Sequence, residues 1–354
     1  MTFHRSVVGP PATDRPVENA LPAAIADGVV RDRPLRVGVI NNPRSGQNAR
    51  HGLLERVRDA LREHPQVPHF EEETSDGMMA AARELMARDT ELIVVNGGDG
   101  TVQAVLTGLL RNPAARVPLL AVLPGGTTNS TARNVGFGTQ PFAALQLLLA
   151  ESARGVLAGR VERRPVIRVD TGGAPQYAMM FAAGAVYHGI TFFRQRVASH
   201  GLRGQLGPAL VTATFIGKVV AGGGGRLVPP LHTAMRLDGH TVAAAPYLGV
   251  LASTMDEQLM GIRPYWGTGP GPVRLTAVGY RPRRLWQAIL PVLRGTPRPV
   301  LRPELGYRSV NADEVVLCFD SGFTLDGELF AVEAGEVEVT LTARQGAYFV
   351  RAHV

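Results

Sequence analysis

The sequence predicts an α/β domain followed by a mainly β domain, and three observations lead to this expectation. Apolar runs of strand type at residues 35–40, 92–95 and 119–123 each end in a loop rich in Gly, Asn and Thr. Segments with helical spacing of apolar residues lie between them. Later in the chain, short apolar runs alternate with Gly, Pro and Asp turns. The first two features are typical of a parallel sheet, which binds its ligand at the carboxyl ends of the strands.

The first strand, residues 35–40, runs into a polar loop that contains Asn42, Pro43, Arg44, Ser45 and Gly46. Residues 53–61 and 78–86 have helical spacing, and both precede the second strand. Strands and helices therefore alternate, which is the order expected of an α/β domain.

The second loop is Gly97-Gly98-Asp99-Gly100-Thr101, and residues 102–110 behind it have helical spacing. A strand that ends in glycines and feeds a helix exposes backbone N–H groups at the helix start, where anions bind. Glycine also allows a phosphate to approach the backbone closely. An aspartate in such a turn can hold Mg²⁺ or accept a proton. Phosphoryl transfer needs both a bound metal ion and a proton acceptor. The loop points to a nucleotide-using enzyme.

The third strand ends in Pro124-Gly125-Gly126-Thr127-Thr128-Asn129. The chain has one lysine, Lys218, which Val219 follows, so a Walker A loop with its Gly-Lys-Ser/Thr is excluded. No G-x-G-x-x-G follows the first strand, which weighs against a standard dinucleotide fold. A phosphate would therefore be held by backbone amides, hydroxyls and arginines.

A second, β-rich domain is predicted to begin near residue 163. Its strand-like runs are short, as in an antiparallel sandwich or barrel, and lie at residues 166–169, 177–181, 231–237, 247–251, 273–278 and 315–319. Asp326-Gly327 has the composition of a hairpin turn between two further strands. Such a turn is also a good place to present the carboxylate of Glu328.

Four motifs in this order resemble those of bacterial lipid kinases in the diacylglycerol kinase, sphingosine kinase and ceramide kinase superfamily. They are N-P-x-S-G at residues 42–46, G-G-D-G-T at 97–101, P-x-G-T-[TG]-N continuing into A-R at 124–133, and D-G-E at 326–328. Thr74 matches a family threonine near the nucleotide. The resemblance spans about residues 35–330, which is most of the chain.

The resemblance implies that ATP and Mg²⁺ are the cofactors and that the active site lies in the cleft between the two domains. The implied nucleotide-binding residues are those of the three loops together with Thr74, namely Asn42, Pro43, Arg44, Ser45, Gly46, Thr74, Gly97, Gly98, Asp99, Gly100, Thr101, Gly126, Thr127, Thr128 and Asn129. Asp99 is expected to organise the Mg²⁺ and the phosphates. Glu328, positioned by Asp326, is expected to be the general base on a primary hydroxyl of a diacylglycerol, ceramide or sphingoid-type lipid. Asp99 remains an alternative general base.

Three departures from the family pattern leave the acceptor lipid open. Ala104 replaces a glutamate, Ser130 replaces an aspartate, and residues 261–272 lack the acids of a structural Mg²⁺ loop. Because a hard cation needs oxygen ligands and usually carboxylates, we expect no structural metal in that loop.

The predicted domain order is a loosely ordered extension at residues 1–32, an ATP-binding domain at 33–162, a lipid-substrate domain at 163–330 and C-terminal strands at 331–354. The resemblance suggests that the last strands, around residues 337–342 and 348–350, return to the first domain. The extension lacks the apolar stretch of a signal peptide, and the single cysteine, Cys318, suits a reducing compartment. A cytoplasmic location is expected.

The net charge of +7 is carried almost wholly by arginine. No zinc spacing, helix-turn-helix pattern or aromatic RNA-binding signature accompanies it, so a nucleic-acid partner is not expected. Attraction to anionic lipid headgroups fits a peripheral enzyme at the inner membrane face, and a solvated charged face in an arginine-biased sequence is the alternative interpretation. Residues 280–290 and 190–220 could contact the bilayer or could be ordinary helices packed on a sheet. The glycines at 222–225 are interpreted as a connection.

Two other functions remain open. An NAD kinase also uses a G-G-D-G-T loop on a related fold. Alternatively, the chain could be a catalytically silent protein that binds nucleotides or lipids.

Overall fold

The computed structural model describes residues 29–48, 52–112, 116–137, 140–157, 160–200, 228–332 and 335–351. Its contacts divide the described chain into an α/β unit, residues 29–166 with 345–351, and an antiparallel unit, residues 167–344. Each unit is built around its own sheet. Among the described residues, no helix combines the length and hydrophobicity that crossing a membrane requires.

The α/β unit contains a six-stranded sheet in the order β3-β2-β4-β5-β19-β7. The strands are β2 (Val37–Asn41), β3 (His69–Glu71), β4 (Leu92–Gly97), β5 (Leu119–Pro124), β7 (Arg160–Pro165) and β19 (Gly346–Arg351). The first four are parallel to one another, β19 is parallel to β5, and β7 is antiparallel to β19. The central strands β2 and β4 are buried along their whole length, which explains their continuous apolar sequence.

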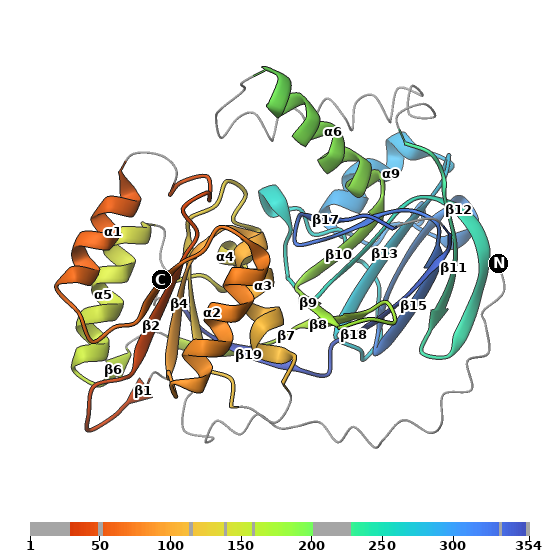
Figure 1. Ribbon diagram of the computed structural model, residues 1–354. Coiled ribbons are helices and arrows are strands. Elements are labelled where there is room, and N and C mark those ends of the chain that lie inside the picture. Colours follow the sequence, from red (N-terminus) through yellow and green to blue (C-terminus); the bar gives the residue numbers. More distant parts are fainter. Residues whose placement is uncertain are drawn as a thin grey trace. The chain divides into compact units, whose positions relative to one another are not determined.

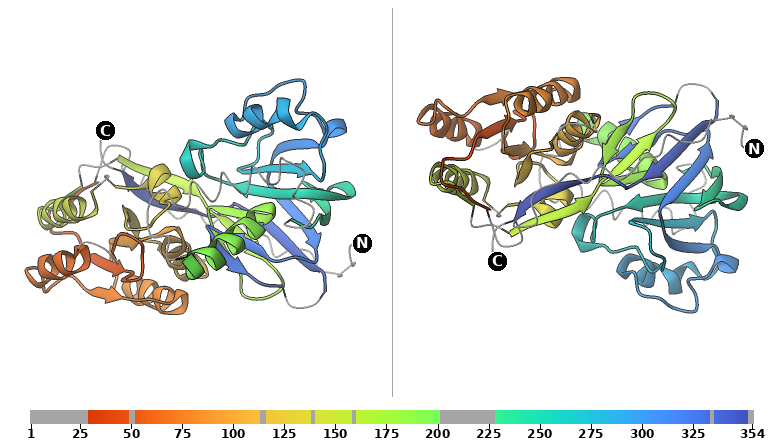
Figure 2. Two further views of the ribbon diagram at one scale, coloured as in Figure 1. Left: turned by 90° about the horizontal axis from the view of Figure 1, so that it is seen from above. Right: turned by 90° about the horizontal axis from the view of Figure 1, so that it is seen from below.

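Helices cover both faces of this sheet (Figures 1 and 2). On one face, α1 (Leu53–Arg62) and α5 (Pro141–Ala153) bury Val57 and Leu145 against alternate strand residues such as Val94. On the other face lie α2 (Ser75–Ala87) and α3 (Asp99–Leu110), and α4 (Ser130–Val135) follows β5. The predicted strand and helix segments of the first domain are confirmed.

A short ribbon lies at the start of the described chain. The strand β1 (Val29–Val30) pairs antiparallel with β6 (Val156–Leu157). Residues 1–28 of the predicted extension lie outside the described residues. Val29 and Val30 were predicted to belong to the loosely ordered extension. They instead form the strand β1 of the α/β unit.

The antiparallel unit contains an eleven-stranded curled sheet. Its strands are β8 (Ile167–Asp170), β9 (Gln176–Ala178), β10 (Met180–Gly184), β11 (Leu231–Leu237), β12 (His240–Ser253), β13 (Val273–Gly279), β14 (Tyr307–Ala312), β15 (Glu314–Phe319), β16 (Phe323–Leu325), β17 (Glu328–Phe330) and β18 (Val337–Thr342). The main path is β17-β16-β10-β12-β11-β15-β18-β8-β9, and β13 joins β12 to β14. The helices in the described part of this unit are α6 (Ala185–His200), α9 (Leu285–Arg294) and the single turns η2 (Leu259–Gly261) and η3 (Pro303–Leu305).

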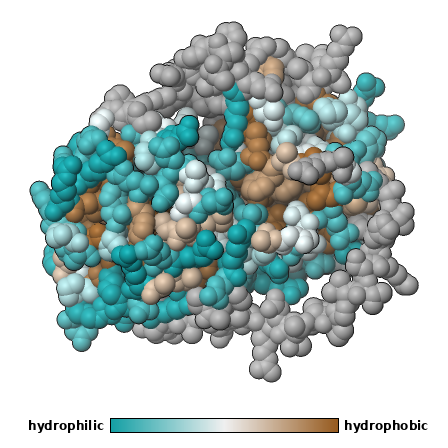
Figure 3. Space-filling view, in the orientation of Figure 1, coloured by the Kyte–Doolittle hydropathy of each residue, from teal (hydrophilic) through white to brown (hydrophobic). Residues whose placement is uncertain are grey.

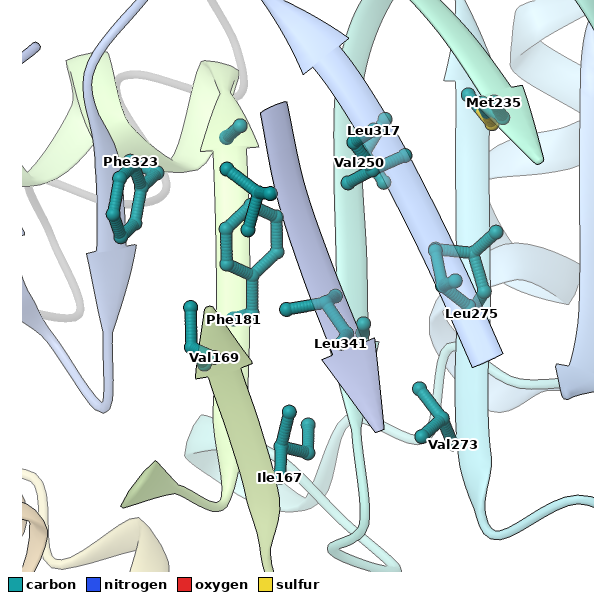
Figure 4. Close-up of a cluster of buried hydrophobic side chains, with 14 of the residues drawn as sticks. Ile167, Val169, Phe181, Met235, Val250, Val273, Leu275, Leu317, Phe323 and Leu341 are labelled. Carbon is teal, nitrogen blue, oxygen red and sulfur yellow. The ribbon is translucent and has the colours of Figure 1, made fainter. Parts of the chain in front are cut away.

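Alternating residues of these strands point inward and form one hydrophobic core (Figure 4). The rings of Phe181 and Phe323 stack with their centroids 5.4 Å apart, and Phe181 is fully buried. In Figure 3 hydrophobic residues gather over this sheet, whereas the helices of the α/β unit present mainly hydrophilic residues. The predicted fold class, an α/β domain followed by an antiparallel β domain, is confirmed.

The path of the chain differs from expectation at two places. Residues 163–165 belong to β7 and thus to the six-stranded sheet. Of the two C-terminal strands, only β19 joins that sheet. The expectation that residues 337–342 also return is wrong, because β18 pairs with β15 on one side and β8 on the other. Both of its edges are therefore satisfied inside the antiparallel unit.

Candidate functional site

The three polar loops of the α/β unit meet at the carboxyl ends of β2, β4 and β5. Backbone hydrogen bonds join them: the N–H of Asn42 donates to Asn96 O at 3.0 Å, that of Gln47 to Gly125 O at 2.8 Å and that of Gly125 to Gly97 O at 3.1 Å. Parallel strands bring such loops to one edge of the sheet. The structure therefore brings together the three predicted loops.

Glycines let these loops approach one another. A Cβ atom on Gly126 would lie 2.5 Å from the Cα atom of Gly98, and one on Gly98 would lie 3.4 Å from Ser45 Oγ. A Cβ on Gly46 would collide with the hydroxyl of Thr127. The first and third loops thus each contain a glycine that the packing of its neighbours requires.

The first loop is fixed by its asparagine side chains. Asn42 Nδ2 donates to Thr101 Oγ1 at 2.9 Å, and Asn42 Oδ1 accepts from the N–H of Arg44 at 2.9 Å. Asn48, which the sequence analysis missed, is buried and donates to the carbonyls of Asn42 and Asn96. Arg44 is exposed, and its guanidinium lies 3.7 Å from the carboxylate of Glu73.

Asp99 connects the second loop to the third. Its Oδ2 accepts from the hydroxyl of Thr128 at 2.6 Å and from the N–H of Ser130 at 3.1 Å. Its Oδ1 accepts from the N–H of Thr131 at 2.7 Å. The carboxylate therefore caps the start of α4, where a negative charge is favourable. Ser130, which departs from the family pattern, contributes its backbone to this cap.

The third loop turns at Asn129, which has a left-handed backbone with φ of 50°. Asn129 Oδ1 accepts from the N–H of Gly126 at 2.7 Å, and Asn129 Nδ2 donates to Gly126 O at 2.9 Å. This reciprocal pair holds the backbone between Gly126 and Asn129 in a closed turn. Thr127, within the turn, is exposed.

Thr74 lies outside the three loops, after β3. It is the N-cap residue of α2, and its Oγ1 accepts from the N–H of Gly77 at 3.1 Å. Since β3 is parallel to β2, Thr74 follows a strand that ends at the same edge of the sheet. Its hydroxyl has a structural use in starting α2, in addition to the predicted contact with the nucleotide.

Two buried asparagines lie side by side directly beneath the loops. Asn41 and Asn96 are register partners in β2 and β4, and neither is exposed to solvent. Asn41 Nδ2 lies 2.6 Å from His69 Nε2, which therefore acts as the acceptor. Burial lowers the pKa of His69 and favours the neutral ring. The sequence signal, which the sequence analysis left unused, is a polar residue at the end of each of two apolar strands.

The Asp326-Gly327-Glu328 turn belongs to the antiparallel unit and joins β16 to β17. Asp326 and Gly327 have φ angles of 47° and 90°, the left-handed pair that a two-residue hairpin requires. The carboxylate of Asp326 is buried and accepts from the N–H groups of Met179 and Met180 at 2.9 and 2.8 Å. Asp326 thus fastens the turn to the segment that begins β10.

Glu328 is the exposed acid of this turn, with 42% of its side chain accessible. Arg194 of α6 donates from Nη2 to Glu328 Oε2 and to Gly327 O, both at 3.0 Å. Arg194 is not predictable from the sequence, because α6 and β17 are more than a hundred residues apart in the chain. Within the described ranges, no three His, Cys, Asp or Glu side chains form a group suited to a metal ion.

Part of the α/β unit is similar to known proteins. Residues 36–161 match the family profile of the diacylglycerol kinase catalytic domain. The chain is 30% identical over 131 residues to a protein of Enterobacter sp. (strain 638) named "Probable lipid kinase YegS-like", covering 36% of this chain and 44% of that protein. It is 31% identical over 140 residues to the diacylglycerol kinase of Bacillus subtilis (strain 168), covering 39% and 46%. The matched segment thus spans slightly less than half the length of these relatives.

The fold is similar along nearly the whole chain to a solved structure. The crystal structure of a diacylglycerol kinase from Bacillus anthracis str. Sterne has a TM-score of 0.55 and 17% identity, covering 90% of this chain and 98% of that chain. At this identity the likeness establishes the fold. Residues 36–161 are similar in sequence to the diacylglycerol kinase catalytic domain, and the three loops lie within this matched segment.

Proposed function

We propose that this protein is an ATP-dependent lipid kinase that transfers the γ-phosphate of Mg-ATP to a primary hydroxyl of a membrane lipid. The acceptor class is diacylglycerol, ceramide or a sphingoid-type lipid. The observation that carries the proposal is the convergence of three glycine loops at one sheet edge, within a segment that matches a kinase catalytic domain. The similarity to proteins named lipid kinase and diacylglycerol kinase supports a lipid acceptor.

The nucleotide phosphates are proposed to lie on the loop amides. Gly97, Gly98 and Gly126 let the loops pack closely against one another, and the hydroxyls of Thr101 and Thr127 lie in the same loops. Thr101 already accepts a hydrogen bond from Asn42, so its own proton remains available for a phosphate oxygen. This arrangement needs no lysine, in agreement with the single lysine of the chain.

The residues present fit a Mg²⁺ ion that arrives with ATP. A carboxylate has about four lone-pair sites, and hydrogen bonds from the third loop occupy three of those on Asp99. One site on Oδ1 remains. Mg²⁺ commonly takes one or two carboxylates and completes its shell with water and phosphate oxygens. Asp99 is therefore proposed to supply one ligand, and the bound ion would neutralise charge on the β- and γ-phosphates.

Glu328 is proposed as the general base and Asp326 as its positioning residue. Both oxygens of Asp326 accept backbone N–H groups, and three hydrogen bonds occupy Asp99, so neither is as available as Glu328 for a substrate proton. The side chain of Glu328, which directly follows the turn residue Gly327, is exposed to solvent. Its ion pair with Arg194 would orient the carboxylate toward an incoming hydroxyl.

The test is transfer of labelled γ-phosphate from Mg-ATP to diacylglycerol, ceramide, sphingoid base and phosphatidylglycerol in mixed micelles, with NAD and a no-lipid control beside them. A labelled lipid supports the proposal and identifies the acceptor. Label on NAD alone would replace the proposal with an NAD kinase. ATP binding without transfer to any acceptor would favour a silent binding protein.

The variant Glu328→Gln tests the base in the same assay. We expect turnover to fall by about 10²- to 10⁴-fold with ATP affinity nearly unchanged, because only proton transfer is removed. Glu338→Gln, an exposed glutamate of the same unit, is the matched control and should retain wild-type turnover. Unchanged turnover in Glu328→Gln would remove Glu328 from this role.

A further inference from the structure

The helix α9 of the antiparallel unit presents two large apolar side chains to solvent. Trp286 is 75% exposed and Leu290 is 53% exposed, whereas Ala288 on the opposite side is fully buried. Trp286 and Leu290 are four residues apart and so lie on one face of the helix. Among the described residues only Leu147 and Val186 are comparable exposed hydrophobics, and neither lies on this helix. The apolar face of α9 is therefore a local feature of this unit.

Arginines surround this face. Residues 280–308 contain seven arginines and one acid, Glu304, so this segment carries a net charge of +6 out of the +7 of the whole chain. Arg281, Arg283, Arg284 and Arg294 are exposed next to or within α9. Within the described ranges, none of the seven forms an ion pair with a carboxylate. Elsewhere, arginines such as Arg58 do so. We give the name α9 surface to two apolar and four basic side chains, namely Trp286, Leu290, Arg281, Arg283, Arg284 and Arg294.

The α9 surface is held in place by the rest of the unit. Beneath α9, Ala288 packs in a small core with Leu301 and Tyr307. The hydroxyl of Tyr307 donates to Arg283 O at 3.0 Å, and the N–H of Arg263 donates to Leu293 O at 2.9 Å. Both ends of the helix are thus anchored, and Figure 2 shows α9 beside the sheet of its own unit. The exposed side chains belong to an ordered element.

A pocket of about 310 Å³ lies where the two ends of the same segment meet residues 245–247. Its lining includes three arginines, one acid and two tyrosines, namely Arg281, Arg283, Arg308, Glu304, Tyr247 and Tyr280. Guanidinium groups bind phosphate through paired N–H donors, and Tyr hydroxyls add further donors. The pocket therefore has the size and the donors to receive the phosphate of a lipid headgroup.

We propose that the α9 surface docks this protein on bilayers that contain anionic phospholipid. Trp286 and Leu290 would enter the interfacial region, where tryptophan is favoured, and the arginines would contact the lipid phosphates. Another copy of the chain fits less well, because a symmetric contact would place the same unpaired arginines against each other. The proposal deepens the proposed function and rests on it for the membrane as the place where the acceptor lies.

The test uses the full chain and vesicles of phosphatidylcholine with or without phosphatidylglycerol, separated by sedimentation. We expect binding to vesicles with phosphatidylglycerol and little binding to phosphatidylcholine alone. The triple variant Arg281→Gln, Arg283→Gln, Arg284→Gln should weaken binding by about 100-fold, and added salt should weaken the wild type. Trp286→Ala with Leu290→Ala should weaken binding at least about 10-fold. Leu147→Ala, which removes an exposed leucine of the α/β unit, should change nothing.

Tryptophan fluorescence gives a second readout. The chain has two tryptophans, Trp266 and Trp286. Binding should shift the emission of the wild type to shorter wavelength and leave Trp286→Phe unshifted, since Trp266 packs against the small core. Equal vesicle binding by wild type and both α9 variants would overturn the proposal. It would also be overturned if the variants altered self-association or RNA binding and left vesicle binding unchanged.

Failure of this proposal can be told apart from failure of the proposed function. Vesicle binding needs neither ATP nor turnover, and phosphate transfer to a lipid in mixed micelles needs no intact bilayer. Transfer without vesicle binding would overturn the α9 surface alone, and vesicle binding without transfer would overturn the kinase alone.

Discussion

The Oδ1 atom of Asp99 accepts a hydrogen bond from the backbone N–H of Thr131 at 2.7 Å. The aspartate of the second glycine loop thus caps the helix that leaves the third. Because Thr131 is buried, its N–H has no access to water if the carboxylate is lost. The residue that the sequence marks for magnesium therefore also sets the geometry of the neighbouring loop.

Replacing Asp99 with Ala should lower the free energy of unfolding of the α/β unit by about 2 kcal/mol, since an N-terminal cap of α4 with charge-assisted hydrogen bonds is lost. Thr128→Val, which removes one of the donors, should cost about 1 kcal/mol. Both tryptophans lie in the antiparallel unit, so urea unfolding should be followed by the helical circular dichroism signal. Wild-type stability in Asp99→Ala would contradict the capping role.

Gly126→Ala should weaken ATP binding by at least about tenfold, or about 1.4 kcal/mol. The added Cβ would lie 2.5 Å from the backbone of Gly98, so the second and third loops must separate. Gly173→Ala is the matched control, because a Cβ there meets no atom within 4 Å. Titration of both variants with ATP measures the difference. Equal affinities would show that the close approach of the loops is not required for the nucleotide.

Asp326→Asn should destabilise the antiparallel unit by about 1–3 kcal/mol. Asn has a single acceptor oxygen, so its NH₂ group would face the N–H of Met179 or Met180. Tryptophan fluorescence during urea unfolding reports this unit. Asp320→Asn, an exposed aspartate before β16, should change the midpoint little. An equal effect of both variants would argue against the special role of the buried carboxylate.

His69 should make the α/β unit less stable as the pH falls below its ordinary pKa near 6.5. Burial lowers the pKa of His69 in the folded state, so the unfolded chain takes up the proton first. The stability that the neutral ring contributes is present above pH 6.5 and is lost as the pH falls toward the lowered pKa of the folded state. Glu71, whose pKa its hydrogen bond with Arg58 lowers, loses its contribution at still lower pH.

Urea unfolding at a series of pH values checks this effect. His69→Gln should flatten the pH dependence just below 6.5, and His64→Gln, in the loop after α1, should retain the wild-type slope. A slope unchanged by His69→Gln would show that another group causes it.

The sequence predicted the α/β core well, because strands buried on both faces are continuous apolar runs and the glycine loops mark their ends. It identified the residues of the three loops but not the use that the fold makes of them. Two of the three donors to Asp99 are backbone N–H groups some thirty positions away, which no side-chain pattern reveals. Arg194 was missed for the same reason, since its partnership with Glu328 exists only after α6 and β17 are placed together.

The sheet that β18 joins could not be predicted from the sequence either. Residues 337–342 and 346–351 are both short segments of strand type, and the available partner strands decide which sheet each one joins.

The position of β19 has a consequence for the order in which the chain can fold. This strand lies between β5 and β7, and its Ala347, Phe349 and Val350 are fully buried. About 180 residues separate β7 from β19, and they form the other unit. During synthesis the six-stranded sheet therefore remains open until those residues have left the ribosome. Until then β5 and β7 keep unpaired edges, and unpaired strand edges favour aggregation.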